Sequence, residues 1–181
     1  MNYARIKKYD IANGPGMRAS LYVSGCTHGC KGCFNEVAWN FNYGEKWTKE
    51  VEDDLIEHLK KPEIKGLNVL GGEPLQQDMT LLLFLKRVRK EVKKPIWLWT
   101  GYTIPYLLQN ENDFSLAVQM MYECDVVVDG RFNENLKDIT LKYRGSSNQK
   151  VYDIEKSIRN SALASGYSIL MSEYLVELEG C

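Results

Sequence analysis

The sequence predicts an α/β protein whose sheet is mainly parallel, with helices as the crossovers. Short apolar runs of strand length alternate along the chain with amphipathic helical segments, which is the pattern of βαβ units. The chain has 181 residues, which is room for about five or six βα units, whereas a closed (β/α)8 barrel takes about 250. Two architectures therefore stay open: a partial, laterally open (β/α) barrel and an open doubly wound sheet.

The strands are predicted from compact apolar runs, several of which end at glycine. The expected strands, in order, are residues 19–24, 66–70, 95–100, 125–129 and 151–154. The first leads directly into a cluster of cysteines, the second ends at Gly71-Gly72, and the third is ended by Gly101. Residues 166–181 are interpreted as one or two further strands.

The helices are predicted from apolar residues that fall on one face. The expected helices are residues 48–60, 76–92 and 115–122, with a weaker helical pattern over 155–164. Thr48 is placed as the N-cap of the first helix, and the acidic residues that follow it suit the positive end of the helix dipole. The stretch 130–149 is polar and irregular.

Composition and charge exclude several classes of protein. Apolar residues make up 44% of the chain and charged residues 26%, which excludes a disordered or fibrous protein. The 23 Lys and Arg against 24 Asp and Glu leave no basic surplus for nucleic acid or an anionic membrane. The longest apolar run, residues 81–85, is too short to cross a bilayer, and the first residues lack the apolar region of a secretory signal. We therefore expect a cytoplasmic protein with no nucleic-acid partner and no membrane partner.

Three of the five cysteines lie within eight residues, at Cys26, Cys30 and Cys33. A secreted disulfide scaffold would spread an even number of cysteines along the chain, so three crowded thiols indicate metal ligation or redox work. Soft thiolates at this spacing suit zinc or an iron–sulfur cluster. Four cysteines would saturate a [4Fe–4S] cluster, whereas three leave one iron with an open position.

A structural zinc is the alternative, and it needs a fourth ligand. The candidates are His28, His58 and Cys124. His28 would close a small chelate ring between the first two cysteines, and His58 is expected on the surface of the first helix. Because a second cysteine knuckle is absent, the pattern favours iron–sulfur. Cys124 is expected to be a buried structural thiol, and Cys181 an exposed one.

Several motifs resemble those of one known family, and they occur in the same order. The C-x3-C-x2-C loop followed by GGEP at residues 71–74 is similar to the radical S-adenosylmethionine (SAM) superfamily. NGPGMR at residues 13–18 and the flanks of the cysteine loop (SGC and CFN) resemble the glycyl-radical-enzyme activases. WLWTGY at 97–102, VDGRF at 128–132 and RGSSNQ at 144–149 narrow the resemblance to the activases of anaerobic (class III) ribonucleotide reductases.

The resemblance covers about residues 1–154 and implies a fold. It favours a partial, laterally open (β/α) barrel of the radical SAM type with about five or six βα units. Residues 1–154 would form one radical SAM activase domain. Residues 155–181 would be a C-terminal extension of uncertain role, packed on the same domain.

The resemblance also implies two cofactors, a [4Fe–4S] cluster and SAM. Cys26, Cys30 and Cys33 are the expected ligands of the cluster, whose open iron takes the amino and carboxylate groups of SAM. The expected SAM contacts are Gly32, Cys33 and Phe34 along the adenosine, backbone carbonyls of the loop Gly71, Gly72, Glu73 and Pro74 at the amino group, and Thr100 at the carboxylate or ribose. Because backbone atoms carry the loop contact, Glu in place of Asp at residue 73 is expected to have little consequence.

For some of these residues a purely structural role is an open alternative. The GGEP loop could be an ordinary strand-to-helix turn in which Pro74 opens the next helix. Phe34 could belong to the core, and Thr100 could cap a helix. Arg18 either pairs with a carboxylate near the site or lies on the surface. Residues 144–149 either contact SAM or the partner protein, or form a solvent loop.

The function implied by the resemblance is that of an oxidoreductase, a glycyl-radical-enzyme activating enzyme. SAM would be cleaved reductively at the cluster, and the 5′-deoxyadenosyl radical would generate a glycyl radical on the anaerobic ribonucleotide reductase. The cofactors carry this chemistry, so no catalytic side chain is assigned. The implied partners are the glycyl radical subunit of the reductase and an electron donor such as flavodoxin or ferredoxin. The alternatives are a small radical SAM enzyme acting on a metabolite, similar to a deazaguanine-forming synthase, and a non-catalytic zinc or iron–sulfur docking module.

Overall fold

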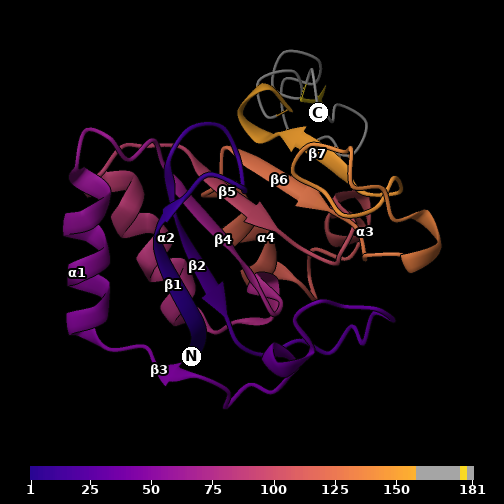
Figure 1. Ribbon diagram of the computed structural model, residues 1–181, viewed down its shortest axis with the longest axis horizontal. Coiled ribbons are helices and arrows are strands. Elements are labelled where there is room, and N and C mark those ends of the chain that lie inside the picture. The colour runs from indigo at the N-terminus through magenta and orange to yellow at the C-terminus, as the bar shows by residue number, and fades with distance from the viewer. Residues whose placement is uncertain (158–175, 179–181) are drawn as a thin grey trace.

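The computed structural model describes residues 1–157 and 176–178, and its framework is one mixed sheet (Figure 1). The strands of this sheet are β1 (Asn2–Asp10), β2 (Arg18–Val23), β3 (Glu45–Lys46), β4 (Leu67–Gly71), β5 (Ile96–Trp99), β6 (Val126–Asp129), β7 (Lys150–Asp153) and β8 (Val176–Glu177). Their order across the sheet is β3-β1-β2-β4-β5-β6-β7-β8.

The centre of the sheet is parallel, as the sequence predicts, and both sides are antiparallel. Strands β2, β4, β5 and β6 pair in parallel. Strand β1 pairs antiparallel with β2 and β3, while β7 pairs antiparallel with β6 and β8. The four parallel strands follow one another in chain order, and this order lacks the reversal that defines a doubly wound sheet.

All the named α-helices pack on one face of the sheet. They are α1 (Lys49–Lys60), α2 (Met79–Glu91), α3 (Ile104–Gln109) and α4 (Ser115–Tyr122). Their buried side chains form one large apolar cluster with every second residue of the central strands, such as Leu21, Val69 and Leu98. The alternate residues face the other way, where Trp97 and Val128 belong to a separate small cluster. The two faces therefore differ: one carries the helices and the main core, and the other is left for polar groups and loops.

Local sequence explains where the helices begin. The hydroxyl of Thr48 accepts a hydrogen bond from the Val51 N–H, which confirms Thr48 as the N-cap of α1. Helix α4 has the bounds expected of it. Helix α2 starts at Met79 rather than at residue 76, because Pro74–Gln76 forms a separate 3-10 turn and Asp78 then caps the helix.

Three of the named elements were not foreseen: the strands β1 and β3, the latter only two residues long, and the helix α3. Strand β1 is irregular: its register against β2 shifts twice, so its sequence lacks the alternation by which strands are recognised. Helix α3 spans Ile104–Gln109, too short for a clear period, and contains a proline in its first turn. The helix expected over 155–164 and the strands expected over 166–181 lie largely outside the described residues, apart from β8.

Arg18 is neither on the surface nor paired with a carboxylate by a hydrogen bond. Its side chain is buried on the sheet face opposite the helices, 5.5 Å from the centre of the Trp97 ring. Nε donates to Asn68 Oδ1 at 2.6 Å, and Nη2 donates to the carbonyls of Leu67 and Pro95 at 2.9 and 2.8 Å. Burial lowers the pKa of Arg18 to about 10, so the guanidinium remains charged at neutral pH.

The polar network continues from Asn68 to the loop that follows β1. Asn68 Nδ2 donates to the Asn13 carbonyl at 2.6 Å and to Ser20 Oγ at 3.0 Å. Ser20 and Asn13 in turn donate to the buried carboxylate of Asp10. These hydrogen bonds lower the pKa of Asp10 although burial alone would raise it. The NGPG segment is thus fixed by side chains of β1, β2 and β4.

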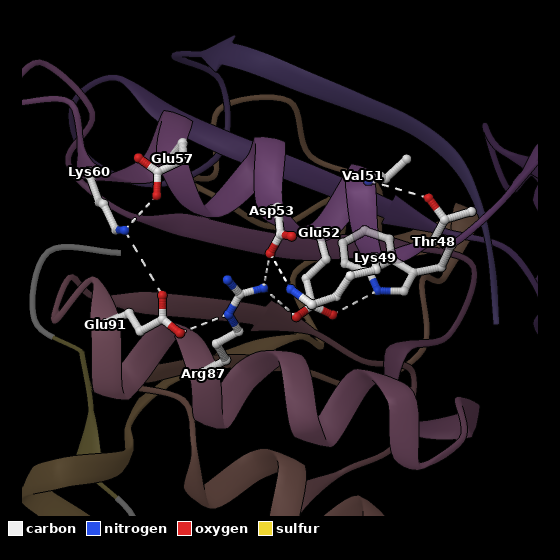
Figure 2. A network of polar contacts seen from close by, with 10 residues as sticks. Thr48, Lys49, Val51, Glu52, Asp53, Glu57, Lys60, Arg87 and Glu91 are labelled. Atoms are coloured by element: carbon white, nitrogen blue, oxygen red, sulfur yellow. Dashed lines mark hydrogen bonds and ion pairs between the residues drawn. The ribbon is translucent and has the colours of Figure 1, made fainter.

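Helices α1 and α2 are joined by ion pairs at their outer surface (Figure 2). Arg87 of α2 lies at the centre and contacts Glu52 at 2.8 Å, Asp53, and Glu91 at 2.8 Å. These carboxylates raise the pKa of Arg87 above its usual value. Because these pairs are partly exposed and screened by salt, they help to orient the two helices more than they stabilise the fold.

Replacement of Arg18 is expected to destabilise the fold strongly. Arg18→Met leaves the carbonyls of Leu67 and Pro95 and the amide oxygen of Asn68 without their donor, and we expect a loss of about 3–5 kcal/mol in the free energy of unfolding. Arg18→Lys keeps the charge but not the three-way geometry, so its loss should be intermediate. Urea denaturation of the cluster-free chain measures both. Arg5→Met, at an exposed position over Tyr22, is the matched control and should cost about 1 kcal/mol or less; equal losses at both positions would contradict the role given to Arg18.

Asp129 should make stability depend on pH. Its buried carboxylate accepts from the Ile104 N–H at 2.8 Å, and burial raises its pKa to about 6. The unfolded chain has a value of about 3.9, so the folded state holds a proton between pH ~4 and ~6 that the unfolded state releases. The contribution of Asp129 to the free energy of unfolding is therefore most favourable below about pH 4, and it is lost as the pH rises through 6. Asp129→Asn should be more stable than the parent at pH 7.5, by on the order of 3 kcal/mol, and this advantage should shrink toward pH 4.5 in thermal unfolding. An advantage that grows toward acid pH would show that the carboxylate is not held in its neutral form.

Candidate functional site

A cavity of about 340 Å³ opens at the carboxyl ends of the parallel strands. Its walls come from the cysteine loop after β2, the GGEP loop after β4, the end of β5, and the loop of residues 130–149 after β6. Ligand sites of parallel α/β sheets form at this edge, because the loops that follow each strand meet there. The cysteine loop, GGEP, the end of the strand within WLWTGY, and the loop that contains RGSSNQ lie far apart in the chain. In the fold they line one cavity.

The cysteine loop presents its three thiols to this cavity. Cys26, Cys30 and Cys33 are free, partly exposed and part of the cavity wall. Burial raises the pKa of Cys26 and of Cys30. The described residues contain no group of three His, Cys, Asp or Glu side chains gathered closely enough to hold one metal ion.

The path of this loop requires glycine at its start. Gly25 has φ of +104°, and a Cβ built on it would lie 2.1 Å from the Phe41 ring. No other residue type fits both constraints. The backbone here is tied to its surroundings, since the Gly25 N–H donates to the Ala38 carbonyl and the Gly25 carbonyl accepts from the Glu73 N–H, each at 2.7 Å.

The side chain of Glu73 is a hub of the site. It is 1% exposed. Oε1 accepts from the Leu75 N–H at 2.9 Å and from the Thr100 hydroxyl at 2.7 Å. Oε2 accepts from the Gly101 N–H and lies within hydrogen-bond distance of His28 Nε2, both at 2.7 Å. The carboxylate thus connects the GGEP loop to the cysteine loop and to the end of β5, which the expectation of a backbone-only role did not anticipate.

Gln76 makes a second connection between the same loops. Its Oε1 accepts from the Thr27 N–H at 2.9 Å, and its Nε2 donates to the hydroxyls of Thr27 and Tyr102 at 2.8 and 2.9 Å. A Cβ on Gly72 would lie 2.4 Å from the Gly25 carbonyl oxygen, so the two loops meet backbone to backbone. The first turn of the cysteine loop is therefore packed directly on GGEP.

The loop of residues 130–149 forms the opposite wall and is held in place by defined contacts. Trp99 Nε1 donates to the Tyr143 carbonyl at 2.7 Å. Gln149 Oε1 accepts from the Gly145 N–H at 2.8 Å, its Nε2 donates to the Gly130 carbonyl at 2.9 Å, and its own carbonyl accepts from Arg144 Nη1 at 2.7 Å. Arg144, Gly145 and Gln149 line the cavity, so part of the RGSSNQ motif faces the site.

The structure brings together most of the residues that the sequence singled out. The predicted residues that line the cavity are Cys26, Cys30, Cys33, Phe34, Gly71, Gly72, Glu73 and Thr100. Gly32 and Pro74 lie outside this lining: Gly32 packs against Glu134, and the buried Pro74 begins a 3-10 turn.

Two of the structural alternatives are wrong. The Phe34 ring is 91% exposed at the cavity wall, so it is not a core residue. Thr100 does not cap a helix, because the residue before α3 is Thr103 and the Thr100 hydroxyl donates to Glu73. Asn13, Trp99 and Tyr143 also line the cavity, and none of them was predicted as a cofactor contact. Asn13 and Trp99 lie in motifs that carry the family resemblance, which was the available signal.

The other metal-ligand candidates are engaged elsewhere. His58 was expected on the helix surface, but it is 3% exposed and its Nε2 lies 2.7 Å from the Lys8 carbonyl, because the irregular strand β1 covers that side of α1. Cys124 is buried as expected, and its thiol donates to the Met120 carbonyl. Burial raises the pKa of this thiol strongly. Cys181 lies outside the described residues.

Within the described part of the chain no helix is long and apolar enough to cross a membrane.

The fold and the thiol-lined cavity define an iron–sulfur protein of the α/β class. Residues 12–152 match a family model described as a 4Fe-4S single cluster domain, and this span includes the cysteine loop and every wall of the cavity.

Curated relatives specify the family further. The chain is 42% identical over 157 residues to a protein of Vibrio cholerae, covering 84% of this chain and 97% of the relative. It is 42% identical over 159 residues to a protein of Escherichia coli K12, covering 85% and 99%, and 38% identical over 156 residues to one of Enterobacteria phage T4, covering 84% and 94%. Each of these relatives is named an anaerobic ribonucleoside-triphosphate reductase-activating protein. The chain belongs to this family of iron–sulfur activating proteins.

The thiols should differ sharply in reactivity when no cluster is bound. In the cluster-free native protein at pH 8, iodoacetamide should modify Cys26, Cys30 and Cys33, which are partly exposed, while Cys124 stays unmodified because it is buried and its pKa is raised. Peptide mass mapping after short labelling measures this, with labelling in urea as the control in which every cysteine reacts. Equal labelling of Cys124 and Cys33 in the native protein would contradict the described burial.

Proposed function

We propose that this protein is a radical SAM activase that generates a glycyl radical on the anaerobic ribonucleotide reductase. The observation that carries this proposal is the placement of three thiols on one loop, facing a cavity whose adjoining wall is the GGEP loop. The names of the relatives support the target, and the family model supports the iron–sulfur cluster. They favour the activase role over a metabolite enzyme or a non-catalytic docking module.

The donor set fits a [4Fe–4S] cluster. Cys26, Cys30 and Cys33 supply three soft ligands, and three ligands leave one iron open to a further molecule. Backbone N–H groups already point at these sulfurs: the Asn35 N–H donates to Cys33 Sγ at 3.4 Å, and the His28 N–H lowers the pKa of Cys26 against the effect of burial. Such donors stabilise thiolates that bind a metal.

The cavity also fits SAM beside the cluster. The Glu73 carbonyl already accepts from the Gln76 N–H and from Gln77 Nε2, both at 3.1 Å, so the carbonyls of Gly71 and Gly72 are the stronger candidates for the SAM amino group. Phe34 and Trp99 supply apolar and aromatic surface at the wall, suited to the adenosine. Gly32 and Cys33 would lie along it, and Pro74 fixes the GGEP turn from behind. The Thr100 hydroxyl faces the cavity while it is held by Glu73.

Bound together, the cluster and SAM supply one-electron chemistry that converts a glycine of the target into its radical. The residues of this chain bind, orient and shield. The three cysteines hold the cluster, GGEP orients the amino-acid end of SAM, and the loop of residues 130–149 excludes water from the far wall. No side chain needs to move a proton, so no catalytic acid or base is proposed.

The architecture suits a macromolecular substrate. We infer a partial, laterally open barrel, supported by four parallel strands in chain order with helices on one face and a cavity at their carboxyl ends. Residues 1–154 form the activase domain in this proposal. The described part of the extension packs on the same sheet, since β8 pairs with β7 and the Leu178 N–H donates to the Val151 carbonyl at 2.7 Å.

The free thiols suit the reducing cytoplasm, where a flavodoxin or ferredoxin would supply the electron.

Cleavage of SAM tests the proposal. The protein reconstituted anaerobically with iron and sulfide, reduced, and mixed with SAM should form 5′-deoxyadenosine, measured by chromatography. Cys30→Ala should lose this activity almost completely because it removes a cluster ligand, whereas Cys124→Ala is the matched control and should retain it.

The target is tested in the same preparation. Addition of the anaerobic ribonucleotide reductase should produce the electron paramagnetic resonance (EPR) signal of a glycyl radical, and Cys30→Ala should abolish it. If the protein binds stoichiometric zinc and leaves SAM intact, the proposal that it is a radical SAM enzyme is wrong. If a small metabolite instead of the reductase stimulates SAM cleavage, the proposed target is wrong.

A further inference from the structure

The hydrogen bond between Glu73 and His28 joins the two loops that the proposed function assigns to SAM and to the cluster. The two side chains lie 2.7 Å apart and are 1% and 4% exposed, although both border a cavity. We propose that Glu73 and His28 are positioning residues, whose bond fixes the middle of the cysteine loop against GGEP and so sets the spacing between cluster and SAM. This inference rests on the proposed function and goes beyond it by assigning a role to two side chains that the proposed function does not use.

The carboxylate of Glu73 has no capacity left for a ligand. An ionised carboxylate offers about four acceptor positions. In the structure it receives the N–H groups of Leu75 and Gly101, the hydroxyl of Thr100 and the ring nitrogen of His28. A carboxylate that is saturated by its own protein orients those groups rather than binding a substrate.

The ring of His28 is held in one place by packing as well as by this bond. It meets the Tyr102 ring edge to face, with the ring centres 4.6 Å apart. Gly101 backs it so closely that a Cβ there would lie 2.4 Å from His28 Cδ2. Tyr102 and Gly101 therefore leave room for the imidazole in one position only. A histidine without a positioning role would not need such close packing.

The position of His28 in the loop gives the bond its effect. His28 lies two residues after Cys26 and two residues before Cys30. Other contacts hold the start of the loop: Gly25 is bonded to the Glu73 N–H of GGEP, and Thr27 is bonded to Gln76. Between the first two cysteines the Thr27 hydroxyl accepts from Gln76 Nε2, next to Cys26, and the His28 ring is bonded to Glu73 in the middle of the segment. Loss of the His28 bond should free the middle of that segment while its start stays attached through Gly25 and Thr27.

Two variants test the pair directly. His28→Phe keeps the ring and removes the nitrogen, and Glu73→Gln removes one acceptor at nearly constant volume. With iron and sulfide content matched, we expect each to slow 5′-deoxyadenosine formation about 10–100-fold, the usual effect of removing a partner that orients a metal ligand. The EPR spectrum of the reduced cluster with SAM should change as well. The double variant should be no slower than the worse single variant, because both remove the same bond.

His58→Phe is the matched control. His58 is equally buried and also has a ring nitrogen bonded to one oxygen, but it lies under β1 away from the cavity. Its EPR spectrum and SAM dissociation constant should equal those of the parent. If His28→Phe and Glu73→Gln, with full iron content, also match the parent in spectrum and rate, the pair only fills space and the proposal fails.

Gly101→Ala perturbs the same bond without changing either partner. The added methyl group must displace the His28 ring, so the variant should reproduce the altered EPR spectrum of His28→Phe. In combination with His28→Ala, which makes room for the methyl group, it should cause no further loss. An unaltered spectrum in Gly101→Ala would overturn the proposed role of the ring position.

A readout without cofactors separates this inference from the proposed function. In the cluster-free protein, His28→Phe and Glu73→Gln should raise the rate at which iodoacetamide modifies Cys26 and Cys30 several-fold, while Cys124 stays protected. Failure of the parent protein to cleave SAM would refute the proposed function, yet this labelling would still report on the loop. Labelling rates equal to those of the parent would refute the positioning role.

Discussion

The sheet depends on one buried guanidinium. Arg18 begins β2, and its donors reach the side chain of Asn68 in β4, the carbonyl at the start of β4 and the Pro95 carbonyl just before β5. A buried charge is tolerated only when its hydrogen-bonding capacity is satisfied, and here neutral oxygens and the Trp97 ring do so. One side chain thereby ties three neighbouring strands on the face that the helices leave uncovered. Because those strands are aligned at one end, the loops that leave them at the other end meet.

Glu73 plays the corresponding part at the carboxyl ends of the strands. It collects donors from the loops after β2, β4 and β5, so each end of the parallel sheet is closed by a single buried ionic group that touches several strands or loops. The helix-covered face does not depend on a buried ionic group, because burial of its apolar side chains holds the helices on the sheet. Polar groups at the two ends of the opposite face instead specify the geometry, and the cavity lies at the Glu73 end.

Patterns of local origin predicted much of this molecule, and contacts across the sheet explain the rest. The parallel centre, the Thr48 cap and the bounds of α4 follow from short-range periodicity and capping. The three thiols and GGEP could be expected to share a site because each follows a parallel strand. Strand β1 and the burial of His58 could not be foreseen, since β1 is irregular and His58 is buried because this strand covers α1. The Arg18 contacts could not be predicted either, because all the partners of this side chain lie at least 49 residues away in the sequence.

The two walls of the cavity come from opposite ends of the chain, and this has a consequence for biosynthesis. A ribosome releases the cysteine loop first, and that loop can dock on GGEP only after 45 more residues have emerged, when Glu73 reaches His28. The second wall follows much later, because Tyr143 must reach Trp99 and Gln149 must reach Gly130. The thiols of a nascent chain therefore remain open to solvent and oxidants until residue 149 has emerged from the ribosome. Insertion of a cluster is best suited to the completed chain, when the last wall can close behind it.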